Sequence, residues 1–268
     1  MNLFSRRFLG VAVLVGYVAL SSMGVAGCPG GSGTISTSVC LQCHNGFSAV
    51  DQSGFPESAH VFLECEACHG NGYLHVRNGG RGGLYIHNPE NLPFETHFEV
   101  CADCHGGQAS QYVLSEHAED RVVTCYDCHD PHVPTGLRLP AVDNTLCMSC
   151  HGFDFPTEAA VREHTHHPVD PAGTGASRCI GCHMPALEQP DPQEGPHEHT
   201  LETVPPIVSA LAAEAGQPVP PNTCAGTNGC HDGSTPTEPV FDVNNPALMR
   251  GIQTLYEAWF AEELANED

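Results

Sequence analysis

The sequence predicts a mostly irregular fold with short α-helices, in which side chains alone do not build the interior. Glycine and proline are abundant, with 28 and 22 residues among 268. Aromatic residues make up 7% of the chain, and no alternating strand pattern persists for long. A chain of this length has enough residues to bury a sizeable core. Its composition therefore indicates that another group fills the interior.

A string repeated six times identifies that group. Cys-x-x-Cys followed directly by His is the attachment site of a c-type haem, in which both thiols bond to the porphyrin and the His ligates the iron. Zinc sites need no adjoining His, and a disulfide framework would not place one after every second Cys. Six covalent haems are therefore expected. Their cysteines and proximal histidines are Cys40, Cys43 and His44; Cys65, Cys68 and His69; Cys101, Cys104 and His105; Cys125, Cys128 and His129; Cys147, Cys150 and His151; and Cys179, Cys182 and His183.

A seventh site is a stretched copy of the same string. Five residues separate Cys224 from Cys230, and His231 still follows the second cysteine. Two glycines in the insertion would let the loop bulge while the sulfurs keep their spacing. The alternative is a surface disulfide between Cys224 and Cys230. The position of His231 favours a seventh covalent haem.

Residues 1–27 are expected to be a secretory signal peptide. Arg6 and Arg7 precede an apolar stretch, and small residues lead up to Cys28. This order resembles a bacterial lipobox, so Cys28 is the expected lipidation site and would anchor the exported protein to the outer membrane, on its periplasmic or cell-surface side. The alternatives are an ordinary signal cleaved nearby or an uncleaved anchor helix. Residues 28–36 would form a Gly/Ser-rich tether.

Two segments are expected after the tether: a six-haem core at 37–188, and a tail at 189–268 that holds the seventh site. Helices are predicted at 157–163, at 207–215 and from 246 to about 260. The last helix begins after Asn245 as its cap and carries an apolar stripe that is expected to cover the last haem. The stripe consists of Leu248, Ile252, Leu255, Tyr256, Trp259 and Phe260.

Eleven of the 18 histidines lie outside the proximal positions. Each bis-histidine haem needs one further imidazole, so seven of the eleven suffice as distal ligands. The methionines that compete for iron in the mature chain are few: Met148, Met184 and Met249. Bis-histidine ligation is therefore expected, and it implies low reduction potentials, because an axial methionine raises them.

Phrases around these histidines carry a family resemblance. They are Cys68-His69-Gly70-Asn71-Gly72-Tyr73-Leu74-His75-Val76, Cys128-His129-Asp130-Pro131-His132, the cluster 164–167 followed by Cys182-His183-Met184-Pro185, and Pro221-Asn222-Thr223-Cys224. Over roughly residues 37–231 the chain resembles the superfamily of tetrahaem cytochrome c and hydroxylamine oxidoreductase. The resemblance implies a polypeptide wrapped around a chain of stacked covalent haems. It also implies distal ligands at His60, His75, His117, His132, His164, His167 and His199, with His87, His97, His166 and His197 as spares.

The charge of the chain excludes one class of partner. The formal net charge is −23, with 32 acidic residues against 9 basic ones, all of them arginine. The phosphate backbone of a nucleic acid would be repelled by such a chain. Two interpretations remain open: a solvated acidic surface, or a surface that docks a basic redox partner.

Two classes of function follow from the predicted haems. An electron carrier passes single electrons between closely spaced bis-histidine haems and has no catalytic residue. A small multihaem oxidoreductase would instead keep one five-coordinate iron open to a nitrogen or sulfur oxyanion. The chain lacks the lysine that ligates the active-site haem of multihaem nitrite reductases, and a lipid anchor argues against a polymerised filament. The surplus of histidines favours a carrier that exchanges electrons with donor and acceptor proteins.

Overall fold

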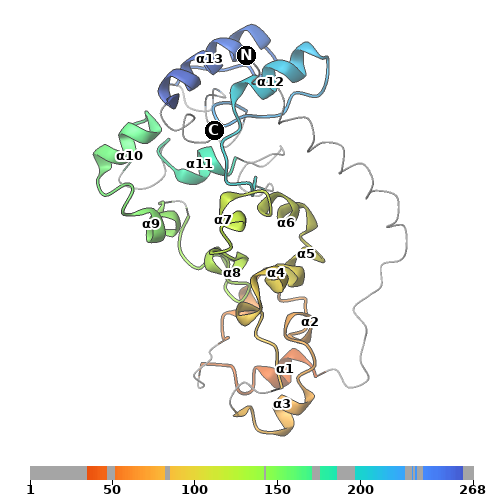
Figure 1. Ribbon diagram of the computed structural model, residues 1–268. Coiled ribbons are helices and arrows are strands. Elements are labelled where there is room, and N and C mark those ends of the chain that lie inside the picture. Colours follow the sequence, from red (N-terminus) through yellow and green to blue (C-terminus); the bar gives the residue numbers. More distant parts are fainter. Residues whose placement is uncertain are drawn as a thin grey trace, which may run out of the picture. The chain divides into compact units, whose positions relative to one another are not determined.

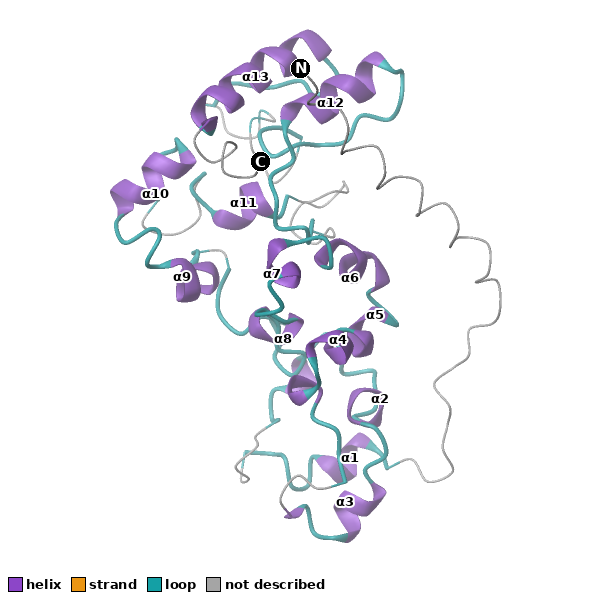
Figure 2. Cartoon of the chain, viewed as in Figure 1, coloured by secondary structure: helices purple, strands orange, loops and turns teal. Residues whose placement is uncertain are grey.

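The computed structural model describes residues 35–46, 52–81, 85–141, 143–170, 176–185, 197–226, 231, 233 and 238–261. Over these residues the chain forms short helices joined by loops, with no strand (Figure 2). Isolated bridges join His129 to Leu137 and Asn222 to Ala225. The predicted class, mostly irregular with short α-helices, is confirmed. The predicted signal peptide, Cys28 and Cys230 lie outside the described residues.

Most of the helices span one or two turns. In chain order, with η for a 3-10 helix, they are α1 (Thr37–Cys40), η2 (Phe55–Glu57), α2 (Glu66–His69), α3 (Tyr73–Arg77), η4 (Pro89–Asn91), α4 (Phe94–His97), α5 (Glu99–Ala102), α6 (Gly106–Tyr112), α7 (Glu116–Glu119), α8 (Cys125–Cys128), α9 (Thr145–His151), α10 (Glu158–Thr165), α11 (Cys179–His183), α12 (Pro206–Glu214) and α13 (Pro246–Trp259). None of the helices within the described ranges is long and apolar enough to cross a membrane.

The three predicted helices are confirmed as α10, α12 and α13. Before α10, the Thr157 hydroxyl accepts a hydrogen bond from the backbone N–H of Ala160. Before α13, the Asn245 side chain accepts one from the backbone N–H of Leu248. After α12, Gly216 takes a φ of +63°, which glycine adopts without steric cost. Because these caps satisfy the open backbone groups at helix ends, the boundaries could be predicted from sequence.

Helix α12 packs against α13 (Figure 1), and buried apolar side chains gather between the two helices. Ala210 and Met249 are fully buried in this cluster, and Ile252 is nearly so. Cys224, the first cysteine of the stretched site, packs against them. Elsewhere large apolar side chains lie open, such as Phe62, which is 79% exposed. The tail therefore has a small protein core, whereas the other described segments leave apolar surface for a bound group to cover.

The stripe predicted for α13 is only partly buried by protein, and its coverage of the last haem stays a prediction. Ile252 and Tyr256 are buried, but Leu255 and Trp259 are 49% and 50% exposed. Met249 lies outside the predicted stripe and is fully buried, and its sulfur accepts a hydrogen bond from the Asn222 side chain at 3.4 Å. The buried face of the helix thus runs through positions 249, 252 and 256. The Met249 sulfur is engaged in the core and is no competitor for iron.

The described chain divides into two compact units. The first contains the described residues up to Cys40 together with Glu64–His87, and the second contains Leu41–Leu63 and the chain from Asn88 onward. Within the first unit, two carboxylates hold the start of the described chain. Glu64 accepts hydrogen bonds from the backbone and hydroxyl of Thr37, and Glu66 accepts one from the backbone of Ile35. The predicted boundary between residues 188 and 189 stays a prediction.

Candidate haem sites

The second to sixth attachment strings adopt about one helical turn each. In the second, third and fourth strings, the backbone N–H of the His donates to the carbonyl of the first Cys, four residues earlier. The distances are 2.9 Å for His69 to Cys65, 2.8 Å for His105 to Cys101 and 2.8 Å for His129 to Cys125. The fifth and sixth strings lie wholly within α9 and α11. Because positions i, i+3 and i+4 share one face of a helix, both sulfurs and the imidazole project to the same side, as covalent haem attachment requires.

In the described part of the chain, a hydrogen bond from Nδ1 orients five proximal histidines. Their acceptors are carbonyl or carboxylate oxygens, so Nδ1 carries the proton and Nε2 keeps the lone pair that binds a metal. The bonds run from His69 to the His87 carbonyl (2.7 Å), from His129 to that of Gly136 (3.0 Å), from His151 to the Asp154 carboxylate (3.2 Å), from His183 to the Leu201 carbonyl (3.0 Å) and from His231 to that of Pro239 (2.9 Å).

Five pairs of histidines face each other in the second unit. Each pair joins a proximal histidine to one of the predicted distal ones. The ring centroids are 6.0 Å apart for His60–His105, 5.9 Å for His117–His151, 6.3 Å for His129–His199, 6.0 Å for His164–His183 and 6.2 Å for His167–His231. A metal–imidazole bond of about 2 Å, with the ring centre about 1.1 Å behind the nitrogen, puts the centroids of two axial imidazoles about 6.2 Å apart. The observed separations fit one iron between the two rings of each pair.

The pair formed by His164 and His183 is the most nearly parallel of the five. The two planes are within 4° of parallel, yet the centroids are 6.0 Å apart. Packed aromatic rings in proteins have centroids about 4.5–7 Å apart. His231 and Phe241 illustrate direct stacking in this chain, at 4.1 Å and 15°. The wider gap between His164 and His183 leaves room for a ligated metal.

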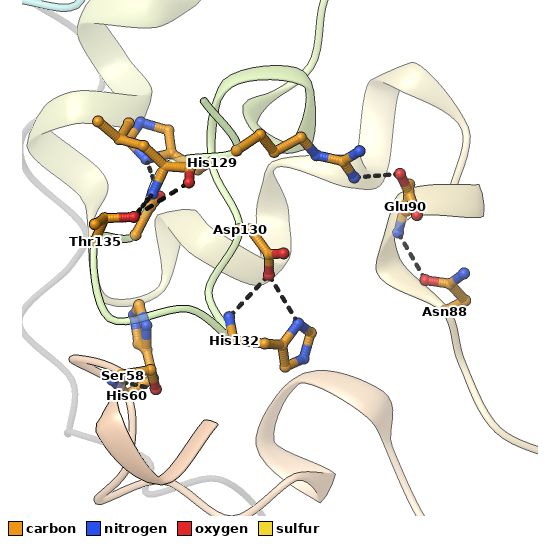
Figure 3. A network of polar contacts seen from close by, with 11 residues as sticks. Ser58, His60, Asn88, Glu90, His129, Asp130, His132 and Thr135 are labelled. Carbon is orange, nitrogen blue, oxygen red and sulfur yellow. Dashed lines mark hydrogen bonds and ion pairs between the residues drawn. The ribbon is translucent and has the colours of Figure 1, made fainter. Parts of the chain in front are cut away.

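His132 and His75 are the other two predicted distal ligands. The carboxylate of Asp130 accepts hydrogen bonds from both the backbone N–H (2.9 Å) and Nδ1 (3.1 Å) of His132 (Figure 3). A carboxylate bonded to one imidazole nitrogen is a common device for orienting a metal-ligating histidine. His75 lies on α3 in the first unit, beside Gly80. Both therefore lie in settings compatible with the predicted role, which stays a prediction.

Burial keeps several of these imidazoles neutral. The pKa values of His60, His117 and His199 lie below the ordinary value of 6.5, because burial penalises the imidazolium form. The facing proximal histidine depresses each of these pKa values further. A neutral imidazole has the free lone pair that iron requires.

The first cysteines of neighbouring strings also come together. The thiols of Cys101 and Cys125 share a hydrogen bond, which lowers the pKa of Cys101 to about 6 and raises that of Cys125. Cys147 and Cys179 form the same contact, which lowers the pKa of Cys147 to about 7. In the first unit, Cys40 and Cys65 are joined in this way as well. The attachment sites are therefore neighbours in three pairs: first with second, third with fourth, and fifth with sixth.

The seventh site is held by the core of the tail. Asn222 is fully buried, and its side-chain oxygen accepts hydrogen bonds from the backbone N–H groups of Cys224 (2.9 Å) and Ala225 (3.0 Å). Its amide nitrogen donates to the Ser209 hydroxyl on α12 at 2.8 Å. The asparagine of the Pro-Asn-x-Cys phrase thus fixes the first cysteine of the site against the core. The choice between haem and disulfide at Cys230 stays a prediction.

Unsatisfied polar atoms test whether a further group fits this chain. In the described part, the buried side-chain atoms without a hydrogen-bond partner are Nε2 of His97, Nδ1 of His117 and Nε of Arg178. Such an atom costs about 1–3 kcal/mol when nothing satisfies it. His97, one of the spares, is only 1% exposed, and its Nδ1 donates to the Phe94 carbonyl at 2.5 Å. Sequence reasoning gave no signal for the burial of His97. These atoms and the paired imidazoles fit a large apolar cofactor with anionic substituents.

Comparisons with known proteins agree with this chemistry. The chain is 27% identical over 158 residues to "Multiheme cytochrome MtrA" of Shewanella baltica. This match covers 54% of the chain and 45% of MtrA. It is 30% identical over 141 residues to "C-type polyheme cytochrome OmcB" of Geobacter sulfurreducens, a match that covers 45% of this chain and 18% of OmcB. It is 28% identical over 208 residues to "C-type polyheme cytochrome OmcC" of the same species, a match that covers 66% of this chain and 24% of OmcC. No family model and no solved structure matches. The chain spans less than half the length of these curated relatives.

The relatives are multihaem c-type cytochromes, which supports covalent haems and a role in electron transfer. The narrower resemblance to the superfamily of tetrahaem cytochrome c and hydroxylamine oxidoreductase is not confirmed by these matches. The distal ligands likewise stay predictions.

Proposed function

We propose that this relative of the multihaem c-type cytochromes is a lipid-anchored carrier that passes single electrons along seven bis-histidine haems. The observation that carries the proposal is the spacing of the five histidine pairs, at 5.9 to 6.3 Å between ring centroids. An iron with an imidazole on each face has no open position for a substrate. The haems would supply reversible one-electron chemistry, while the chain holds them, closes both axial positions and sets their order.

On this proposal five of the seven distal histidines serve an identifiable attachment site. His60 belongs to the third site, His199 to the fourth and His117 to the fifth, while His164 and His167 belong to the sixth and seventh. His75 and His132 then remain for the first two sites. His60 and His117 each precede the site they serve by an entire intervening site in the sequence. Distal ligation would therefore connect segments that are distant in the sequence, whereas each attachment string involves only neighbouring residues.

The order of the haems follows from the same contacts. Because the first cysteines touch within three pairs of sites, the two haems of each pair would be neighbours. The sixth and seventh haems would be linked differently, through His164 and His167 on one short segment. Close neighbouring haems are the physical requirement of a carrier, and these contacts would supply them within each pair and between the sixth and seventh sites. The acidic surface of the chain suits a donor or acceptor protein with a basic docking face.

The number of haems tests the proposal directly. Intact-mass analysis is expected to show seven haem additions, and a reductive titration is expected to take up seven electrons per chain, because each of the seven attachment sites has a proximal histidine. Variants with Cys224 and Cys230 both changed to Ser should lose one haem and one electron. A mass with six haems and one disulfide, unchanged in haem content by that double substitution, would rule out the stretched site.

The lipid anchor is tested by the substitution Cys28→Ala. The variant is expected to move from the membrane fraction to the soluble fraction, because acyl chains on Cys28 would supply the membrane affinity. Ser32→Ala, in the predicted tether, is the matched control and should stay in the membrane fraction. If Cys28→Ala remains membrane-bound, the lipoprotein assignment is wrong, and an uncleaved helix or a membrane partner holds the protein.

A further inference from the structure

The C-terminal end of α13 contacts the segment that follows α10 (Figure 1). The imidazole of His166 stacks on the indole of Trp259, with centroids 5.3 Å apart and planes 20° from parallel. Nε2 of the same imidazole is 3.2 Å from the Trp259 carbonyl oxygen and donates a hydrogen bond to it, although the two residues are 93 positions apart. Phe260 meets the His166 ring edge-on at 5.3 Å. His166 is thus held on two sides by the end of α13.

The backbone of His166 explains why such a hold is needed. This residue caps α10 in the left-handed conformation, at φ +55°. Residues other than glycine adopt that conformation rarely, and it persists where the surroundings enforce it. The resulting reversal of the chain sends His164 toward His183 and His167 toward His231. One strained residue thus separates two side chains that face different proximal imidazoles.

Aromatic rings also fix the first of these two side chains directly. The ring of His164 lies 4.8 Å from that of Phe155 and 6.3 Å from that of Phe260. His167 is fixed by its own turn, in which Nδ1 donates to the Thr165 carbonyl at 2.5 Å. The contacts from α13 therefore act on His164 through Phe260, and on His167 through the backbone of His166.

We propose that His166, Trp259 and Phe260 form an aromatic clamp that positions the distal ligands of the sixth and seventh haems together. The inference rests on the proposed function, since it takes His164 and His167 as those ligands. His166 is then a positioning residue and no spare. The end of α13 would thereby affect electron transfer between the sixth and seventh haems. The reason is that the clamp sets how firmly each of these two irons holds its second imidazole.

The test is Trp259→Ala, with Leu255→Ala as its matched control. Leu255 lies one turn earlier on α13 and is exposed to the same extent, 49% against 50%. Trp259→Ala is expected to keep seven haems, because attachment depends on cysteines. In a fraction of the molecules, the sixth and seventh haems should become high-spin. Carbon monoxide should then bind at up to two irons, and two of the reduction potentials should shift. Leu255→Ala should leave all three readouts at their wild-type values.

Further variants separate failure of the clamp from failure of the ligand assignment. His166→Phe, which keeps a ring against Trp259 but removes the Nε2 hydrogen bond, should disturb the same two haems to a smaller extent. His164→Ala and His167→Ala should each open one iron fully. The clamp is wrong, and the carrier stands, if His164→Ala and His167→Ala each open an iron while Trp259→Ala and His166→Phe keep wild-type spectra. The clamp is also wrong if Leu255→Ala disturbs the same two haems as Trp259→Ala. If neither His164→Ala nor His167→Ala opens an iron, the ligand assignment fails, and the clamp with it.

Discussion

Replacing His117 with alanine is expected to open one iron of seven to external ligands while all the haems stay attached. His117 faces the proximal His151 at 5.9 Å, and covalent attachment at this fifth site depends on Cys147 and Cys150 instead. Loss of the distal imidazole leaves a five-coordinate, high-spin iron. In the reduced protein, carbon monoxide should then bind at one haem per chain, which its absorbance change measures against the total haem content.

Two further substitutions sharpen the prediction for His117. His117→Met should keep the iron six-coordinate and low-spin and raise the potential of one haem, because an axial thioether favours the reduced state. His197→Ala is the control, since the resemblance classes His197 as a spare and none of the five facing pairs in the described chain includes it. This control should bind no carbon monoxide. The assignment of His117 is wrong if His117→Ala stays closed, or if His197→Ala opens an iron as readily.

The attachment sites were predictable from sequence because their geometry is local. A Cys-x-x-Cys-His string needs only one helical turn to place two sulfurs and an imidazole on one side, and the hydrogen bond from His129 to Cys125 shows that turn. The helix ends were predictable for a similar reason. Thr157 and Asn245 accept hydrogen bonds from backbone groups three residues on, which sequence alone indicates.

The pairing of histidines was not predictable in this way, because it depends on where distant segments meet. Nothing near His60 in the sequence indicates that it faces His105, beyond the intervening second site. The resemblance selected seven histidines but could not match each one to a site. It also classed His166 as a spare, although contacts with Trp259 give this residue a structural role.

The apolar stripe of α13 shows a second limit. Helical spacing correctly predicted an apolar face, but two adjacent faces satisfy the same pattern, and packing against α12 chose the one that contains Met249. The other face, with Leu255 and Trp259, stays half exposed. Trp259 is thereby available to stack on His166, a contact between segments that no local pattern encodes.

The second prediction with a large effect concerns the spin state of the irons in the wild-type protein. Since the proposal closes both axial positions of every iron with imidazole, all seven haems should be low-spin when oxidised. A single five-coordinate haem would instead contribute a high-spin signal from one iron in seven. That difference separates a carrier from an oxidoreductase that acts on a nitrogen or sulfur oxyanion.

The most direct measurement is therefore a quantitative count of low-spin and high-spin iron in the purified, fully loaded protein, followed by exposure of the reduced form to carbon monoxide and of the oxidised form to nitrite. The account predicts seven low-spin haems and no binding of either molecule. One high-spin haem that binds carbon monoxide or nitrite in the wild-type protein would contradict the carrier and identify an open iron as a site of catalysis.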